Sequence, residues 1–199
     1  MTDIKKKRIK SVFKYTWPFY LISGVLIFFG LTFIFGIAHR TPGYKTLTLF
    51  VSGEVQDHKK LEDDLLLKYK DNDLKSVSTT SVDPNDGSYI TKLSVVGYNG
   101  SDLLIMPVSK LDIINLSAFA LDLDANLINN YYEGYTFYNY EGASYGIKVD
   151  KSKVEQYMSL PNEDCYLLLN AKSENIGEYS SSKVKERDNA LTVARDWGM

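Results

Sequence analysis

The sequence predicts an α/β domain on a single transmembrane helix, with a mostly parallel sheet that has helices on both faces. Three observations lead to this prediction. Residues 16–38 form an uncharged run of 23 residues behind a basic segment. From residue 45 onward, strand-like and helix-like segments alternate three times, which is typical of a mostly parallel sheet with covering helices. Residues 103–106 are continuously apolar, as expected for a strand buried on both faces.

The uncharged run is long enough to span a membrane. As a helix rising ~1.5 Å per residue it would extend about 35 Å, against a hydrocarbon core about 30 Å thick. Six Lys or Arg residues stand between positions 5 and 14, whereas only Arg40 and Lys45 follow the run closely. The positive-inside rule therefore predicts a single-pass protein of the cell membrane, with a cytoplasmic N-terminus and an extracellular C-terminal domain. Residues 16–38 are expected to contact membrane lipid.

A cleaved signal peptide is the alternative interpretation of this segment. Such a peptide has an apolar stretch of about 7–15 residues and a small-residue cleavage site, which Gly36-Ile37-Ala38 would fit. The run is longer than that, and Trp17 and Tyr20 stand where interfacial aromatic residues anchor a membrane helix. We therefore expect an uncleaved anchor.

Charge and cysteine content restrict the class of protein. Residues 1–40 contain seven Lys or Arg and one acid, a net charge of +6, whereas the remainder contains sixteen against twenty-four, a net charge of −8. An acidic domain argues against nucleic acid as a partner, because phosphate neutralisation needs clustered cations. Cys165 is the only cysteine, so no intramolecular disulfide can form, which favours a bacterial origin for an exported domain. The expected organisation is a cytoplasmic tail at 1–15, the membrane helix at 16–38, a linker at 39–44 and the domain at 45–199.

The first strand and helix of the domain follow the linker directly. Residues 45–51 are mostly apolar and β-branched, which predicts a strand that Ser52-Gly53 ends. Asp57 can cap a helix over residues 58–69, because its side chain can accept a hydrogen bond from the first turn. The apolar stripe of that helix consists of Leu61, Leu65 and Tyr69.

The second and third predicted strands are each followed by a predicted helix. Residues 74–82 are predicted to form a strand, and the composition of 83–88 (DPNDGS) predicts a turn. Apolar residues then recur with helical spacing over 89–97. The buried strand at 103–106 ends at a proline, and Ser109 can cap a helix that continues to about residue 117.

The second half of the domain has a different pattern. Residues 135–140 and 144–149 are predicted to pair as a hairpin around Glu141-Gly142. The remaining expected elements are a short helix at 151–159, a buried strand at 165–170 and a helix at 188–197. The last helix should bury Ala190, Leu191, Ala194 and Trp197.

Five segments of the domain carry a family resemblance. They are LTLFVSGEV, SYITKLSVVGYNGSDLLIMPVSKL, FALDLD, EGASYGIKV and the tail CYLLLNAKSENIG … DNALTVARDWG. In this order they resemble the extracellular solute-binding proteins of bacterial ABC importers, specifically the first lobe. The resemblance extends over residues 45–199 as a series of short motifs. It implies a single periplasmic-binding-protein-like lobe.

One departure from that family changes the expected mechanism. The family inserts a second lobe after the Tyr-Gly strand and clamps its solute between the two lobes. Here only 15 residues separate Val149 from Cys165, which is too few for a lobe. Residues 147–149 (IKV) also lack the proline that the family has at the middle position. A single lobe cannot close on a solute by a hinge motion.

The resemblance and the strand order together predict a ligand-binding edge. Open α/β sheets bind ligands at the carboxyl ends of their strands. Carried over by position, the predicted ligand-binding residues are Ser52, Gly53, Glu54, Ser109 and Tyr145. A half-site of this kind should bind weakly, because pockets usually enclose most of a small ligand.

The sequence predicts neither a metal site, nor a cofactor, nor a catalytic residue. Four side chains match positions 1, 3, 5 and 12 of a calcium loop, but Leu127 occupies the position that needs glycine. His58 is the only histidine beyond the membrane exit, and it does not resemble part of a triad. A divergent hydrolase would need His58 beside a nucleophile in a cleft, and we therefore expect a protein that is not an enzyme.

The expected function is a membrane-anchored extracytoplasmic binding or accessory module, associated with a transporter and able to take a small-molecule solute. The alternative is a structural or regulatory envelope protein that uses the domain for protein–protein contact. The first hypothesis requires a polar crevice at Ser52, Glu54, Ser109 and Tyr145. The second predicts that these side chains are covered or dispersed, and that the tyrosine-rich residues 131–140 form an exposed aromatic patch.

Overall fold

The computed structural model describes residues 3–38, 41–182 and 187–199. The chain divides into two compact units, Met1–Arg40 and Thr41–Met199. The first unit contains helix α1 (Asp3–Ala38), which begins well before the uncharged run. Within it, Lys14–Gly36 has a mean hydropathy of 2.2 and is long and apolar enough to cross a membrane, by length and composition.

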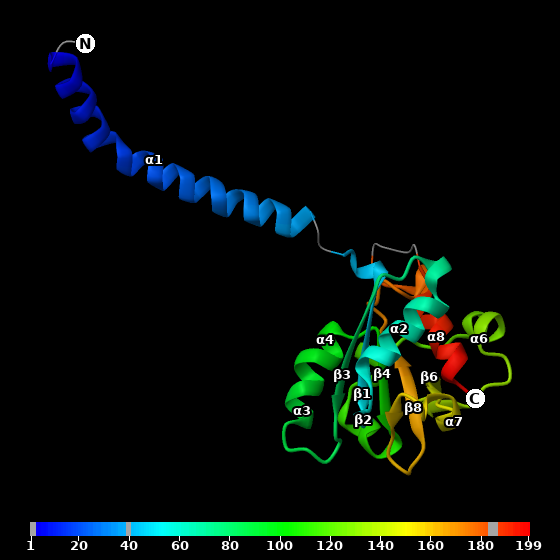
Figure 1. Cartoon of the computed structure of the whole chain (residues 1–199). Helices are drawn as coiled ribbons and strands as arrows, with labels where there is room; N and C mark the ends of the chain where they lie inside the picture. The colour runs from blue at the N-terminus through cyan, green and yellow to red at the C-terminus, as the bar shows by residue number, and fades with distance from the viewer. Residues whose placement is uncertain (1–2, 39–40, 183–186) are drawn as a thin grey trace. The chain divides into compact units, whose positions relative to one another are not determined.

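The second unit contains a six-stranded sheet with the order β3-β1-β4-β8-β6-β5 (Figure 1). The strands are β1 (Thr46–Ser52), β3 (Ser76–Val82), β4 (Leu103–Pro107), β5 (Phe137–Tyr140), β6 (Ala143–Lys148) and β8 (Cys165–Leu169). Strand β1 pairs in parallel with β3 and β4, and β8 is antiparallel to both β4 and β6. Strands β3, β1, β4 and β6 therefore run in one direction, and the predicted mostly parallel sheet is confirmed.

Helices cover both faces of this sheet, as predicted. One face of β1 contributes Leu47, Leu49 and Val51 to a core that also contains residues of α2 (His58–Lys68), α6 (Ala125–Tyr131) and α8 (Asn189–Trp197). The other face contributes Phe50 to a second core, with residues of α3 (Tyr89–Lys92) and α5 (Leu116–Phe119). This division follows from the alternation of side chains along a strand.

Several elements differ from the prediction in length or kind. The helix expected at 109–117 is a 3₁₀ turn (Val108–Ile113) followed by α5, and the helix expected at 151–159 ends early as α7 (Lys151–Val154). Beyond α7, β7 (Met158–Ser159) pairs with β2 (Glu54–Val55) in a small antiparallel sheet. The helix expected at 89–97 continues from α3 through a π turn (Leu93–Gly97) to α4 (Tyr98–Gly100). The 3₁₀ turn, α5, α7 and the β2–β7 pair are too short for periodicity in the sequence to define them.

Helix α6 was not expected, because its region resembles an acidic turn. Asp124 Oδ1 accepts a hydrogen bond of 2.8 Å from the backbone N–H of Leu127, so Asp124 is the N-cap of α6. Leu127, which stands where a calcium loop needs glycine, is completely buried in the core. The acidic residue therefore begins a helix, and the apolar residue anchors it.

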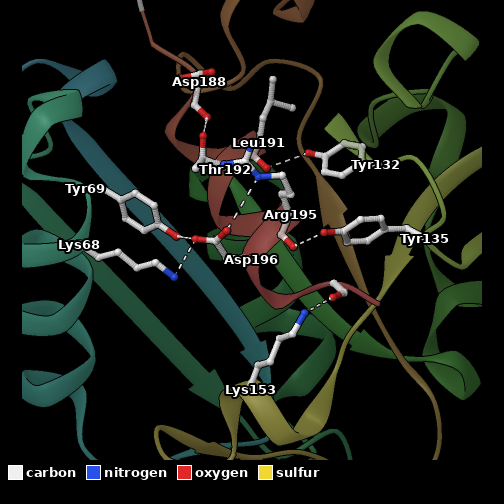
Figure 2. A network of polar contacts seen from close by, with 11 residues as sticks. Lys68, Tyr69, Tyr132, Tyr135, Lys153, Asp188, Leu191, Thr192, Arg195 and Asp196 are labelled. Atoms are coloured by element: carbon white, nitrogen blue, oxygen red, sulfur yellow. Dashed lines mark hydrogen bonds and ion pairs between the residues drawn. The ribbon is translucent and has the colours of Figure 1, made fainter. Parts of the chain in front are cut away.

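Tyrosines and lysines from distant parts of the chain bind the C-terminal helix α8 (Figure 2). Tyr132 donates to the Leu191 carbonyl at 3.0 Å, and Tyr135 donates to the Arg195 carbonyl at 2.9 Å. Lys153 donates to the Gly198 carbonyl at 2.8 Å, just beyond the end of the helix. The last carbonyls of a helix have no partner within it, so Tyr135 and Lys153 satisfy acceptors that α8 leaves open at its C-terminal end.

A carboxylate on α8 completes this attachment. Asp196 accepts a hydrogen bond from Tyr69 at 2.5 Å and forms an ion pair with Lys68 at 2.8 Å (Figure 2). Both partners lie at the end of α2. Burial works against ionisation of Asp196, but these two partners hold its pKa below the ordinary value. Burial also raises the pKa values of Tyr69 and Tyr132, which therefore remain neutral donors.

The tyrosine-rich stretch is mostly part of the core rather than an exposed patch. Tyr132 is completely buried, and Tyr131, Tyr135 and Phe137 pack against the same core. Tyr140 is 41% exposed. The aromatic surface that the protein-contact hypothesis predicts is therefore reduced to the end of β5.

Candidate functional site

A cavity of about 530 Å³ lies at the carboxyl ends of β1 and β3. It is lined by nine residues from three segments, which form its three walls. The first wall consists of Gly53 and Glu54, the second of Ser81, Asp83, Pro84 and Asn85, and the third of Ser159, Leu160 and Pro161. The parallel pairing of β1 with β3 brings the first two segments together, because Ser52 is in register with Val82. The cavity thus occupies the end of the sheet where open α/β sheets bind ligands.

Gly53 allows the first and third walls to approach closely. Its backbone N–H donates to the Val82 carbonyl at 3.0 Å, which joins the ends of β1 and β3. A Cβ atom at position 53 would lie 2.5 Å from the backbone oxygen of Ser159. Only a residue without a side chain fits here without displacing the β2–β7 pair.

Substitution of Gly53 should therefore destabilise the fold. We expect Gly53→Ala to lower the free energy of unfolding by about 1–3 kcal/mol, because the backbone of residue 159 must move. Urea unfolding of the full chain in nanodiscs of zwitterionic lipid, followed by the change in tryptophan fluorescence, measures this loss. Gly87→Ala is the matched control, since a Cβ at that exposed turn meets nothing within 4 Å. Equal stability of the two variants would contradict this account of Gly53.

The second wall is a turn whose own side chains fix its shape. Asp83 Oδ1 accepts from the backbone N–H of Asn85 at 2.8 Å, and Asp86 Oδ1 accepts from that of Ser88 at 2.7 Å. The hydrogen bonds from Ser88 hold the pKa of Asp86 below its ordinary value. The turn leads directly into α3. Asp83 and Asn85 are thereby held at the rim of the cavity.

The third wall depends on the segment between α7 and β8. Gln56 donates its backbone N–H to the Tyr157 carbonyl at 2.9 Å, beside the β2–β7 pair. The Lys151 ammonium donates to the Pro161 carbonyl. Leu160 and Pro161 add apolar surface to a lining that is otherwise largely polar.

The five predicted ligand-binding residues lie in different environments. Gly53 and Glu54 line the cavity. Ser52 is completely buried, and its hydroxyl is 2.7 Å from the Tyr89 hydroxyl. Ser109 is exposed, and both its backbone N–H and its hydroxyl donate to the Glu163 carboxylate, at 2.9 and 2.7 Å. Tyr145 is 9% exposed and belongs to the core that contains Phe50.

None of the seven lining residues of the second and third walls was anticipated from the sequence. Asp83 and Asn85 belong to a predicted turn, and parallel pairing of the first two strands would have placed that turn beside Glu54. Ser159 and Leu160 had no such signal, because β7 reaches the cavity only through its pairing with β2, which is about a hundred residues away in the chain.

A second polar cavity, of about 540 Å³, lies at the opposite end of the sheet, and Asp102 lies in its wall. Asp102 Oδ2 accepts from the backbone N–H of Thr48 at 2.7 Å, and Oδ1 accepts from the Ser173 hydroxyl at 2.5 Å. Burial raises the pKa of Asp102, although these hydrogen bonds oppose the shift. An aspartate directly before a fully apolar strand was the only signal for this role. Its contacts hold β1, β4 and the loop after β8 together.

The described residues do not bring a histidine or a metal-ligand cluster to the first cavity. His58 is exposed at the start of α2, and its Nδ1 is hydrogen-bonded to the Thr79 hydroxyl. Neither residue lines the cavity. Within the described ranges, no group of three or more His, Cys, Asp or Glu side chains is close enough to hold a metal ion.

Comparison with known proteins gives matches at the level of structure. No protein-family model matches the chain, and no curated protein matches it. The maltose/maltodextrin-binding domain MalE from Bdellovibrio bacteriovorus, bound to maltotriose, is similar with a TM-score of 0.39 and 16% identity, over 52% of this chain and 28% of that one. An ABC substrate-binding protein from Listeria monocytogenes in complex with cycloalternan has a TM-score of 0.33 and 15% identity, over 56% and 32%.

A third solved structure, from work on xylan utilisation by the thermophilic bacterium Caldanaerobius polysaccharolyticus, has a TM-score of 0.34 and 20% identity, over 56% of this chain and 33% of that one. The chain therefore spans about a third of the length of each of these structures.

Proposed function

We propose that the chain is a membrane-anchored binding module whose α/β domain takes a small solute into the cavity at the carboxyl ends of β1 and β3. The observation that carries this proposal is the position of the cavity. The ends of two adjacent parallel strands and a connecting segment converge there, and polar side chains from all three line about 530 Å³. That volume lies within the range of small-molecule sites.

The site is one-sided, so affinity should be modest. Between Val149 and Cys165 the chain forms only α7, β7 and short connections. No segment described in Thr41–Met199 forms a second lobe that could close over the cavity. A solute would remain partly exposed to water, and the proposed module would present or sense a solute rather than enclose it.

The proposed setting is the cell membrane, with α1 spanning the bilayer and the domain outside. The excess of Lys and Arg before residue 15 supports this orientation, because cytoplasmic flanks of membrane helices are positively charged. Residues 41–43 lead into the amino end of β1, whereas the cavity lies at its carboxyl end. A transporter is the proposed partner, and it would meet the domain as an accessory binding module. We propose no catalytic step.

A pocket-filling variant tests the proposed function. Thermal unfolding of the full chain in zwitterionic nanodiscs would be measured with maltotriose, triglycine, putrescine and succinate. A ligand present at ten times its Kd stabilises the folded state by about 1.4 kcal/mol, which is a shift of about 3–6 °C for a domain of this size. Asn85→Trp should abolish the shift, because the indole would occupy the cavity.

Asn129→Trp is the matched control, since Asn129 is exposed on α6 and does not line the cavity. It should leave the ligand-induced shift unchanged. No shift with any of the four compounds, or a shift that Asn85→Trp retains, would overturn the proposal. Either result would favour the alternative in which the domain acts through protein–protein contact.

A further inference from the structure

We infer that the cavity selects solutes that carry a protonated amine and rejects anionic ones, an inference that rests on the proposed function. Its nine described lining residues include two carboxylates, Glu54 and Asp83, and no Lys, Arg or His. The two acids come from different walls, one from the end of β1 and the other from the turn after β3. A solute that bridges these walls therefore meets negative charge on both.

Both carboxylates have oxygens available to a ligand. Asp83 Oδ1 accepts from the backbone N–H of Asn85, which orients the carboxylate, while Oδ2 makes no hydrogen bond within the described ranges. Glu54 makes no side-chain hydrogen bond or ion pair there either. An ammonium group has three donors and no acceptor, so it is complementary to such oxygens. A carboxylate or phosphate ligand would instead face like charges.

Three lysines of the domain have partners other than these carboxylates. The Lys151 ammonium donates to the Pro161 carbonyl. Lys148 forms an ion pair with Asp164 at 2.9 Å. Lys110 lies over the Tyr89 ring, 5.9 Å from its centroid. The charge of the two acids is therefore not neutralised by a described ion pair, and it can act on a solute.

Three four-carbon compounds that differ in charge test the inference: putrescine, 1,4-butanediol and succinate. Exposed ion pairs favour association by about 1.4- to 5-fold each. With two carboxylates, putrescine should bind about 2- to 30-fold more tightly than the diol, and succinate should bind more weakly than the diol. The preference should shrink at 0.5 M salt, where charges are screened over about 4 Å. Calorimetry on the full chain in zwitterionic nanodiscs gives the three affinities.

Charge-neutral variants locate the effect. Glu54→Gln and Asp83→Asn should each reduce the preference for putrescine over butanediol, and Asn can still accept the hydrogen bond from residue 85. Glu133→Gln is the control, an exposed acid beyond α6 that removes the same charge from the domain. Equal affinities for all three compounds, or a preference that survives in the Glu54→Gln/Asp83→Asn variant, would overturn the inference.

The outcomes also separate this inference from the proposed function. If butanediol or succinate binds as tightly as putrescine, and Asn85→Trp abolishes that binding, the cavity is a binding site without charge selection. If none of the three compounds binds and the earlier panel also fails, the proposed function itself is wrong. Putrescine binding that persists in Asn85→Trp is adventitious attraction to an acidic domain, and it overturns the inference.

Discussion

Replacing Trp197 by alanine is expected to lower the free energy of unfolding of the domain by about 3–5 kcal/mol, the usual cost of truncating a large buried aromatic side chain. Trp197 is the last residue of α8 and is 4% exposed, and it belongs to the core that contains Leu47 and Leu49. Its removal leaves a cavity where α8 meets the sheet. The donors from Tyr132 and Tyr135 hold the helix in place, so collapse of that cavity should be incomplete.

Urea unfolding followed by far-UV circular dichroism measures this loss, because the variant lacks the only tryptophan of the domain. Tyr135→Phe is the matched control, since it removes only the hydrogen bond that Tyr135 donates to the Arg195 carbonyl of the same helix. It should cost about 1 kcal/mol. A loss from Trp197→Ala no larger than that of Tyr135→Phe would show that α8 is attached by its polar contacts rather than by packing.

The predicted burial of α8 shows what sequence patterns can establish. Ala190, Leu191, Ala194 and Trp197 were predicted to face inward, and all four are buried. Strand β1 and helix α2 were also predicted to within one residue at each end. In the two helices, apolar residues recur with the helical period over two turns or more, so burial of one face follows from local sequence alone. Strand β1 is instead a run of mostly apolar and β-branched residues, and it is buried on both faces.

Elements that depend on distant partners could not be predicted in this way. Strands β2 and β7 have two residues each, and they exist because Glu54 pairs with Ser159. The predicted site residue Ser109 is paired with Glu163, 54 positions away, and no local pattern indicates that contact. For the same reason the sequence anticipated one wall of the cavity, at Gly53 and Glu54, and missed the two walls that pairing brings to it.

Asp102 is the residue whose removal should most disturb the end of the sheet that lies away from the proposed binding cavity. We expect Asp102→Ala to lower the free energy of unfolding by about 2–4 kcal/mol. It would leave the backbone N–H of Thr48 and the hydroxyl of Ser173 without their acceptor. Each unsatisfied donor costs about 1–3 kcal/mol, and water that enters the site recovers part of this cost. Asp102→Asn keeps the shape and one acceptor, and should cost about 1 kcal/mol at low pH. Urea unfolding gives both values.

The pH dependence of these variants has a definite sign. Burial raises the pKa of Asp102 above its ordinary value of 3.8 in the folded state. The folded chain therefore binds this proton more tightly than the unfolded chain, and the stability contributed by Asp102 is fully present below pH 3.8. It is lost as the pH rises through the raised value. Asp102→Asn carries no such proton, so its stability relative to the wild type should improve as the pH rises through this window.

Asp86→Asn provides a control of opposite sign. Hydrogen bonds from Ser88 lower the pKa of Asp86, so its contribution is present above the ordinary value and is lost as the pH falls. The stability of Asp86→Asn relative to the wild type should therefore decline as the pH rises. Urea unfolding of all three chains from pH 3 to 7 should give two differences that change in opposite directions. If both stability differences change in the same direction, the carboxylate of Asp102 is not desolvated in the folded state. The contact between β1 and β4 at this residue would then depend on the backbone hydrogen bonds of Asp102.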